Sequence, residues 1–348
     1  MPECGAQRCK IGFPLNNKDA QIFVVGAGIV GLWQALVLAR RGWRVRLIEA
    51  SADPFALSAS RYAGAMLAPD CEAEAAPDVV KEFGHEGLEL WRQTYPALVE
   101  AGTLVVASAR DRSELQRFAR LTSGYTPVDD RAIGELEPDL ATRFSSGLYF
   151  ANEAHMETPA AMAFLLDEAR RAGVNVALGE PIDDIGALEG TVVDCRGMAA
   201  ADDIASLRGV RGERLIVHAP DVTLARPLRL LHPRQPLYVV PWSGDRFMIG
   251  ATVIESEDDG PATVHSALDL MGNAFALHPG FGEAQIIEIG AGLRPAFPDN
   301  VPRVALARDG RLIRVNGAYR HGFLLAPVLG EVVAGVLSDP AFTHPLLL

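Results

Sequence analysis

Hydrophobic residues near the start of the chain are spaced as a strand, a helix and a second strand would require. Residues 22–25 form a short apolar run that is typical of a buried strand. Over residues 29–37 the apolar side chains recur at helical spacing, and two arginines then precede Gly42, which is placed to end the helix. A second apolar run covers residues 45–48. The pattern therefore predicts a β-α-β unit at the front of the fold.

Further helices and strands follow from the same kind of pattern. Thr158 has the hydroxyl expected of a helix N-cap, and Pro159 suits the first helical position. Between residues 210 and 257, apolar and polar residues alternate, and Ser243, Gly244 and Asp245 are suited to close a hairpin between two antiparallel strands. The expected helices cover residues 77–100, 113–121, 158–172 and 263–277, and further strands are expected at 103–107 and 174–178.

The sequence GAGIVG joins the first predicted strand to its helix and has the G-x-G-x-x-G spacing through Gly26, Gly28 and Gly31. The first glycine permits a tight turn, the second lets a pyrophosphate approach the backbone, and the third lets the helix pack on the strand. Glu49 ends the second strand, where its carboxylate can accept a hydroxyl of a ribose. This context predicts a dinucleotide-binding site.

A membrane segment is the alternative interpretation of the same stretch. Residues 22–39 are apolar apart from Gln34, and Arg8, Lys10 and Lys18 precede them as the basic end of a signal peptide would. However, no small-x-small cleavage site comes before the arginine pair at 40–41, and an anchor gives no reason for a following strand that ends in an acid. We therefore favour the dinucleotide site.

Composition and charge narrow the class of protein. A chain of 348 residues, nearly half of them apolar, can form two packed domains, and the first twenty residues are expected to be a loosely held extension. The net charge of −12 argues against nucleic acid or an anionic membrane as a partner, so local positive groups must hold any anionic substrate.

The cysteines and histidines indicate no metal. Neither a C-x-x-C pair nor a nearby His cluster accompanies the cysteines, so we expect no zinc site, no disulfide framework and a reducing cytoplasm as the location. One His and one acid in a loop, His155 and Glu157, are more often solvated than metal-bound. The cysteines are Cys4, Cys9, Cys71 and Cys195.

Arg294 is the most informative charged residue, because it interrupts the apolar strand LRPAF. An arginine carried inward is costly unless it meets a carboxylate. That carboxylate could belong to a structural ion pair or to the α-carboxylate of an amino-acid substrate, which a guanidinium grips as a planar fork. Tyr238, in PLYVVP, could point its hydroxyl at the same carboxylate or be a core residue.

Several stretches resemble the D-amino-acid oxidase and glycine oxidase family of flavoproteins. They are the opening glycine motif, a small-residue segment at 51–69 that ends in Met-Leu-Ala-Pro, the motif G-L-R-P at 292–295, and G-x-Y-R-x-G-x-L-L-A-P at 317–327. The last two look most like the glycine oxidase branch, which is linked to the synthesis of the thiamine thiazole. The resemblance to that branch extends over residues 226–337, and with the opening motif it covers roughly two thirds of the chain.

This resemblance implies a fold and a cofactor. The expected fold is α/β, with a Rossmann-type FAD-binding domain on a parallel sheet, interleaved with a substrate domain on an antiparallel sheet. Residues 21–75, 150–205 and 290–348 would form the FAD-binding domain, residues 76–149 and 206–289 the substrate-binding domain, and residues 1–20 an extension. The FAD is expected to be noncovalent, because the final segment has no cysteine.

The resemblance also implies the residues of the site. Arg294 would bind the substrate carboxylate, assisted by Tyr238 and Arg320. The turn before a helix that begins near Pro327 would face the flavin, and Met248, Ala251 and Phe323 would be pocket walls. The residues expected at the cofactor are Gly26, Gly28, Ile29, Val30, Gly31, Glu49, Ala50, Gly64, Ala65, Met66, Val176, Gly197, Gly292, Arg294, Arg320, His321, Gly322, Phe323, Leu324 and Leu325.

Three departures from the family pattern are visible. Many members have Gly directly before the methionine of the small-residue segment, whereas this chain has Ala65. Cys195 and Arg196 replace the alanines that are usual in the turn at the cofactor. These positions test whether the same cofactor contacts can form on a different local sequence.

The function implied is oxidation of glycine by dioxygen to glyoxylate, ammonia and hydrogen peroxide, with hydride transfer to flavin N5 and no side-chain base. His232 and His321 are therefore not expected to be catalytic. Alternative substrates are sarcosine, iminodiacetate and small D-amino acids, and relatives suggest a homo-oligomer, namely a tetramer. Two other classes remain open: a nicotinamide-dependent dehydrogenase and a non-catalytic flavoprotein subunit of an oxidase complex.

Overall fold

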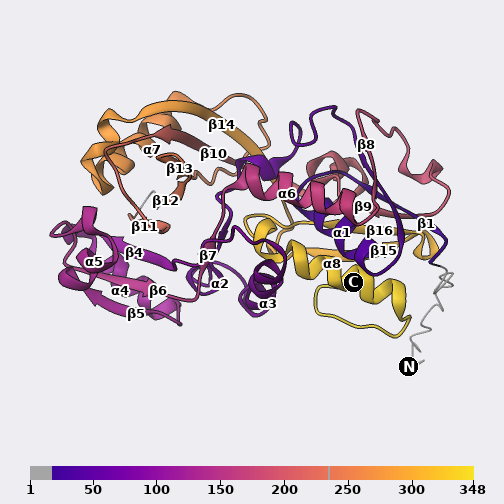
Figure 1. The fold of residues 1–348 in the computed structure, drawn as a ribbon, viewed down its shortest axis with the longest axis horizontal. Coiled ribbons are helices and arrows are strands. Elements are labelled where there is room, and N and C mark those ends of the chain that lie inside the picture. The colour runs from indigo at the N-terminus through magenta and orange to yellow at the C-terminus, as the bar shows by residue number, and fades with distance from the viewer. Residues whose placement is uncertain (1–17, 234–235) are drawn as a thin grey trace, which may run out of the picture.

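Two β-sheets organise the chain, and Figure 1 shows them at opposite ends of the molecule with helices packed around them. The structure is a computed structural model that describes residues 18–233 and 236–348. Most of the predicted extension at residues 1–20, with Cys4 and Cys9, lies outside the described residues.

The first sheet has six strands in the order β15-β16-β9-β1-β2-β8. Five of them run parallel, and β15 pairs antiparallel with β16 at one edge. The predicted β-α-β unit at the front of the chain forms the centre of this sheet. The strands are β1 (Gln21–Val25), β2 (Arg44–Glu49), β8 (Asn175–Leu178), β9 (Thr191–Asp194), β15 (Arg303–Ala307) and β16 (Leu312–Asn316).

Four helices pack with this sheet. Helix α1 (Ile29–Arg40) lies between the sheet and helices α6 (Thr158–Arg171) and α8 (Gly322–Ser338), and α3 (Asp78–Thr94) packs against α8. Because α1 has neighbours on most sides, nearly all of its side chains are buried, including Gln34. Burial among these elements explains the apolar run that resembled a membrane segment.

No helix within the described residues combines the length and the apolar character needed to cross a membrane.

The second sheet has eight strands in the order β14-β10-β13-β12-β11-β4-β6-β5. All neighbours are antiparallel except β11 and β4. The strands are β4 (Thr103–Ala107), β5 (Thr126–Asp129), β6 (Ser146–Phe150), β10 (Arg208–His218), β11 (Leu228–Leu231), β12 (Leu237–Trp242), β13 (Arg246–Gly250) and β14 (Gln285–Ala296). Helices α4 (Arg112–Leu121), α5 (Asp130–Leu136) and α7 (Val264–Leu277) flank it.

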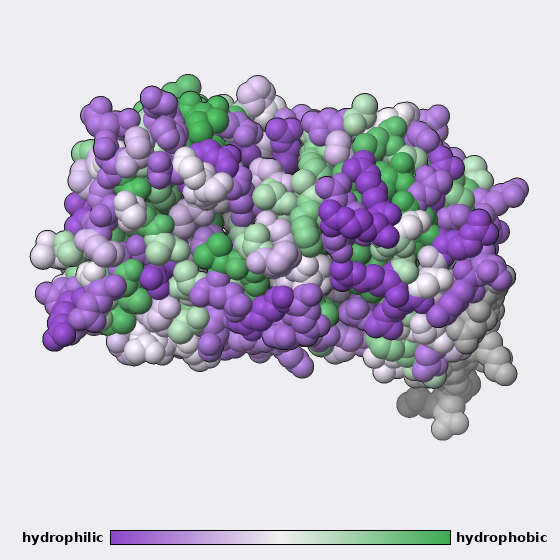
Figure 2. All heavy atoms as spheres, in the orientation of Figure 1, coloured by the Kyte–Doolittle hydropathy of each residue, from purple (hydrophilic) through white to green (hydrophobic). Residues whose placement is uncertain are grey.

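The surface of this second region carries exposed apolar side chains. Figure 2 shows green atoms at the upper left, where Figure 1 places α7 and β14. Strand β14 is at the edge of the eight-stranded sheet. The exposed apolar residues of these elements are Val264, Leu268 and Phe275 in α7 and Ile286, Ile287 and Ile289 in β14.

The predicted fold class agrees with these sheets, whereas the elements cross the expected domain boundaries. The boundary between residues 289 and 290 falls inside β14. Helix α3 falls in the expected substrate domain, yet its Val80, Leu88 and Trp91 share the core of the six-stranded sheet. The division into two interleaved domains therefore stays a prediction, and α3 belongs to the hydrophobic core of the six-stranded sheet.

One predicted helix boundary is wrong because of a partner distant in sequence. Helix α6 begins at Thr158, but its N-cap is Glu157. The hydroxyl of Thr158 donates a hydrogen bond to the backbone carbonyl of Ala63 at 2.7 Å instead of capping the helix. This bond ties the start of α6 to the small-residue segment.

Helix α8 begins at Gly322, five residues before the start expected near Pro327. A proline inside a helix cannot donate to the carbonyl four residues earlier, which here belongs to Phe323. The indole Nε1 of Trp91 donates to that carbonyl at 2.6 Å, so the acceptor is satisfied. The bond comes from α3, and it lets the helix continue through Pro327.

We expect Trp91→Phe to lower the free energy of unfolding by about 1–3 kcal/mol, because the buried carbonyl of Phe323 loses its donor. In a Pro327→Ala background the backbone N–H of residue 327 can donate instead, so the same substitution should cost about 1 kcal/mol less. Urea unfolding of the four proteins of this double-mutant cycle measures the difference. Equal costs in both backgrounds would contradict the assigned role of Trp91.

Candidate active site

A cavity of about 710 Å³ lies between the two sheets. On one side it is bounded by the carboxyl ends of β1, β2, β9 and β16, which is where ligands of parallel α/β sheets bind. On the other side it is bounded by β10, β12 and β14, and the start of α8 closes one end. Residues that represent these walls are Gly26, Glu49, Gly197, Asn316, Gly212, Tyr238, Arg294 and Gly322.

The glycine turn is shaped as a cradle. Gly26 has φ +102°, and a Cβ there would lie 2.7 Å from the carbonyl oxygen of Cys195. Gly28 is the N-cap of α1, and a Cβ on it would lie 3.0 Å from the hydroxyl of Ser58. A side chain at either position would therefore displace its neighbours, and at Gly28 it would also fill the approach to the start of the helix.

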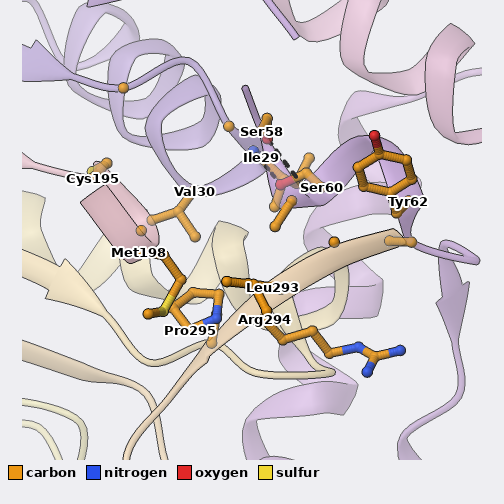
Figure 3. A pocket seen from close by; sticks show the side chains of 18 of the residues that line it. Ile29, Val30, Ser58, Ser60, Tyr62, Cys195, Met198, Leu293, Arg294 and Pro295 are labelled. Atoms are coloured by element: carbon orange, nitrogen blue, oxygen red, sulfur yellow. Dashed lines mark hydrogen bonds between the residues drawn. The ribbon is translucent and has the colours of Figure 1, made fainter. Parts of the chain in front are cut away.

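Two serines stand beside the cradle, although the sequence interpretation did not single them out. The backbone N–H of Ile29 donates to the hydroxyl of Ser60 at 3.1 Å, and Figure 3 shows Ser58 and Ser60 grouped at this end of α1. Helix N-termini carry unsatisfied N–H groups and a partial positive charge, so this corner suits a phosphate. The signal for these serines was the small-residue composition of 51–69, which does not indicate which members reach the helix.

Glu49 lies at the end of β2 and lines the cavity. Its two carboxylate oxygens accept hydrogen bonds from the backbone N–H groups of Ala27 at 2.8 Å and Ser51 at 3.1 Å. Each oxygen keeps a further acceptor site, because an ionised carboxylate offers about four. The residue is thus held in place with capacity to accept a ligand hydroxyl.

The small-residue segment forms a second wall through Gly64, Ala65 and Met66. A Cβ at Gly64 would lie 2.5 Å from Cε of Met248 and 3.0 Å from the ring of Tyr238. Met248 therefore packs behind Gly64 and does not line the cavity. Tyr238 lines it from β12.

Arg294 extends from β14, which crosses the cavity opposite the start of α1 (Figure 3). Its Nη1 donates to the backbone carbonyls of Arg211 at 3.3 Å and Thr252 at 3.1 Å. The guanidinium lies directly over Gly212, where a Cβ would collide with it. Within residues 18–233 and 236–348 it forms no ion pair, so the structural carboxylate partner that the sequence allowed is not among them.

Arg320, in contrast, is paired. Its Nη2 lies 3.2 and 3.3 Å from the two carboxylate oxygens of Glu72. Burial alone would raise the pKa of Glu72, but Arg320 and Arg229 lower it to about 2, so the acid is ionised. The sequence interpretation missed Glu72, which ends the four-residue helix α2 (Pro69–Glu72) and lines the cavity.

His321 also lines the cavity. Burial lowers the pKa of its imidazole to about 4, so the ring is neutral near pH 7. Its Nδ1 lies 3.9 Å from the carboxylate of Glu72.

The structure brings most of the other predicted site residues to this cavity. Three of them lie elsewhere. Gly31 packs against the carbonyl of Gly26, and Val176 in β8 packs against the hydrophobic core of the six-stranded sheet. Leu325 is buried inside α8. These three residues and Met248 therefore have packing contacts rather than positions on the cavity. The remaining residues that line it are Ile29, Val30, Ala50, Gly292, Ala251, Phe323 and Leu324.

The cavity has one wall suited to a dinucleotide and another that presents a cation without an acidic partner in the described chain. An enzyme that oxidises a small anion with a bound dinucleotide needs both walls. The architecture therefore places the chain among the dinucleotide-dependent oxidoreductases.

Known proteins define the family. The model of the FAD dependent oxidoreductase (DAO) family matches residues 21–336. The chain is 48% identical over 324 residues to a putative thiamine biosynthesis oxidoreductase ThiO of Rhizobium etli, covering 92% of this chain and 97% of that protein. It is 25% identical over 362 residues to a glycine oxidase of Bacillus licheniformis, covering 94% and 96% of the two chains.

A solved structure gives the same result. The crystal structure of glycine oxidase from Geobacillus kaustophilus has a TM-score of 0.77 and 25% identity to this chain, covering 93% of this chain and 97% of that one. The chain belongs to the DAO family of FAD-dependent oxidoreductases and is of the glycine oxidase type. The predicted family, fold class and FAD cofactor are confirmed, and the nicotinamide-dependent alternative is excluded.

Ala65 carries a backbone conformation that favours glycine, because its φ is +48°. We expect Ala65→Gly to raise the free energy of unfolding by about 0.5–1 kcal/mol, since relief of the strain outweighs the added entropy of the unfolded chain. The matched control is Ala63→Gly. Ala63 has an ordinary φ of −74°, so this substitution should lower the free energy of unfolding. Thermal unfolding measures both, and a loss of stability in both variants would contradict the argument.

Proposed function

We propose that the protein oxidises glycine: glycine, water and dioxygen give glyoxylate, ammonia and hydrogen peroxide. The observation that carries the proposal is the inward guanidinium of Arg294, which faces the same cavity as the dinucleotide cradle and forms no ion pair in the described chain. A partly buried cation of this kind is stabilised when a ligand supplies the anion. The α-carboxylate of an amino acid supplies it with planar geometry.

The residues around the cavity fit FAD. Gly26 and Gly28, with the hydroxyls of Ser58 and Ser60 at the start of α1, would hold its pyrophosphate, and Glu49 would hold a ribose hydroxyl. When bound, noncovalent FAD supplies the two-electron acceptor that takes a hydride from the substrate α-carbon and returns the electrons to dioxygen.

The start of α8 would support the same cofactor from the other side. Gly322, Phe323 and Leu324 form its first turn and line the cavity, so backbone N–H groups and the positive end of the helix face inward. That end suits negative charge on the cofactor.

Substrate binding would depend on orientation rather than on a side-chain base. Arg294 would fix the carboxylate, and the hydroxyl of Tyr238 on the same face would assist it. His321 is neutral near pH 7 and sits against Glu72. A substrate amine in its neutral form needs no further proton acceptor at the α-carbon, so the site has only to bind, orient and exclude water.

Sarcosine, iminodiacetate and small D-amino acids are the alternative substrates. Sarcosine and D-alanine each differ from glycine by one carbon, and a single methylene changes preference by only about 1–3 kcal/mol, so these two compounds compete closely with glycine. A non-catalytic flavoprotein subunit would have no use for a guanidinium held in the cavity without a partner.

The relative in Rhizobium etli is named for thiamine biosynthesis, and by analogy the imine formed here would feed the synthesis of a thiazole.

We expect Arg294→Ala to raise the KM for glycine about 10- to 100-fold, because one or more charged hydrogen bonds worth about 1.5–3 kcal/mol are lost. The flavin spectrum should be retained. Initial rates of peroxide formation measure the effect. Arg208→Ala, in the adjacent strand β10 but off the cavity, is the matched control and should keep the wild-type KM.

An unchanged KM in Arg294→Ala would remove this residue from substrate binding. A yellow wild-type protein that forms no peroxide with any of the small amines would contradict the proposed function itself.

A further inference from the structure

Two of the four arginines that line the cavity form ion pairs with acids that do not line it. Arg196 pairs with Asp194 at 2.9 Å and with Asp203 at 2.6 Å. Arg214 pairs with Glu288 at 3.2 Å. Both guanidinium groups therefore have anionic partners within the protein.

The other two arginines, Arg294 and Arg320, line the same cavity. Only Arg320 has an acidic partner within the described residues, and that partner is Glu72. Two guanidinium groups and one carboxylate leave a net charge of one positive unit. A single substrate carboxylate would bring that sum to zero, whereas a second carboxylate would leave an uncompensated negative charge in a partly buried cavity.

Glu72 is firmly held in this position. Nη1 of Arg229 lies 3.5 Å from Oε1 of Glu72, while Nη2 of Arg229 lies 3.0 Å from Glu74. Arg229 is buried, and it contacts both acids. Since the surrounding cations keep Glu72 ionised, its charge is a fixed part of the pocket at every pH at which the protein would be assayed.

We propose that Glu72 determines how many carboxylates the substrate can carry: by occupying Arg320 it reserves Arg294 as the single carboxylate site and disfavours dicarboxylate amines. This inference rests on the proposed function of the same cavity. It separates glycine and sarcosine, with one carboxylate, from iminodiacetate, with two. A residue that touches no reacting atom would thus set specificity through the charge of its partner.

The test uses ligands that cannot be oxidised as amines. Glutarate has the shape of iminodiacetate with a methylene in place of the nitrogen, and butyrate retains only one of its carboxylates. Titrating each into the FAD-loaded protein, and following the perturbation of the flavin absorbance, gives two dissociation constants. We expect wild-type protein to bind glutarate no more tightly than butyrate.

In Glu72→Gln the amide keeps the shape but frees the charge of Arg320. The preference for glutarate over butyrate should then rise about tenfold or more, which is the effect of one charged contact. The matched control is Glu74→Gln, which also contacts Arg229 but lies off the cavity, and its preference should match wild type. Adding Arg320→Met to Glu72→Gln should abolish the gain.

Three results would overturn the inference: wild-type protein that binds glutarate tenfold more tightly than butyrate, an unchanged preference in Glu72→Gln, or an equal rise in Glu74→Gln. If Glu72→Gln does not retain FAD, the wild-type titration can still overturn the inference, because tighter binding of glutarate would contradict it. With amines, kcat/KM for iminodiacetate relative to glycine should rise about tenfold in Glu72→Gln. If the wild-type protein oxidises neither amine, the proposed function fails, while the titrations still test the role of Glu72.

Discussion

The guanidinium of Arg294 is the constraint on which the rest of the site depends. It is carried inward by a strand of the antiparallel sheet and shares one cavity with the glycine turn of the parallel sheet. Backbone carbonyls of Arg211 and Thr252 accept from one of its nitrogens, and the missing side chain of Gly212 leaves room for it. These contacts orient the charge without neutralising it, so the most favourable state of the site includes an anion.

The architecture brings this charge to the same cavity as the starts of two helices. Helices α1 and α8 pack along each other, and both begin at the cavity. Helix α8 can begin early enough because Trp91 satisfies the carbonyl that Pro327 leaves without a donor. A hydrogen bond between α3 and α8 therefore supports the helix whose first turn lines the cavity.

Local patterns predicted much of the fold, because each depends on residues close in sequence. The β-α-β unit, the strand at 103–107 and the hairpin at Ser243 were all predicted from periodicity and turn residues. The role of Thr158 and the start of α8 were predicted wrongly, because each depends on a hydrogen bond to a residue far away in the sequence. Thr158 bonds to Ala63, which is 95 residues away, and Phe323 in the first turn of α8 bonds to Trp91, which is 232 residues away. Glu72 was missed for the same reason: it ends a helix too short for any periodicity, and Arg320 is 248 residues away.

The measurement that tests the central claim most directly is a crystal structure of the FAD-loaded protein with glycolate, which has the carboxylate of glycine but no amine. We predict that its carboxylate lies within hydrogen-bond distance of the guanidinium of Arg294, on the side away from the carbonyls of Arg211 and Thr252. A carboxylate bound elsewhere in the cavity, or an Arg294 side chain turned out of it, would contradict the account.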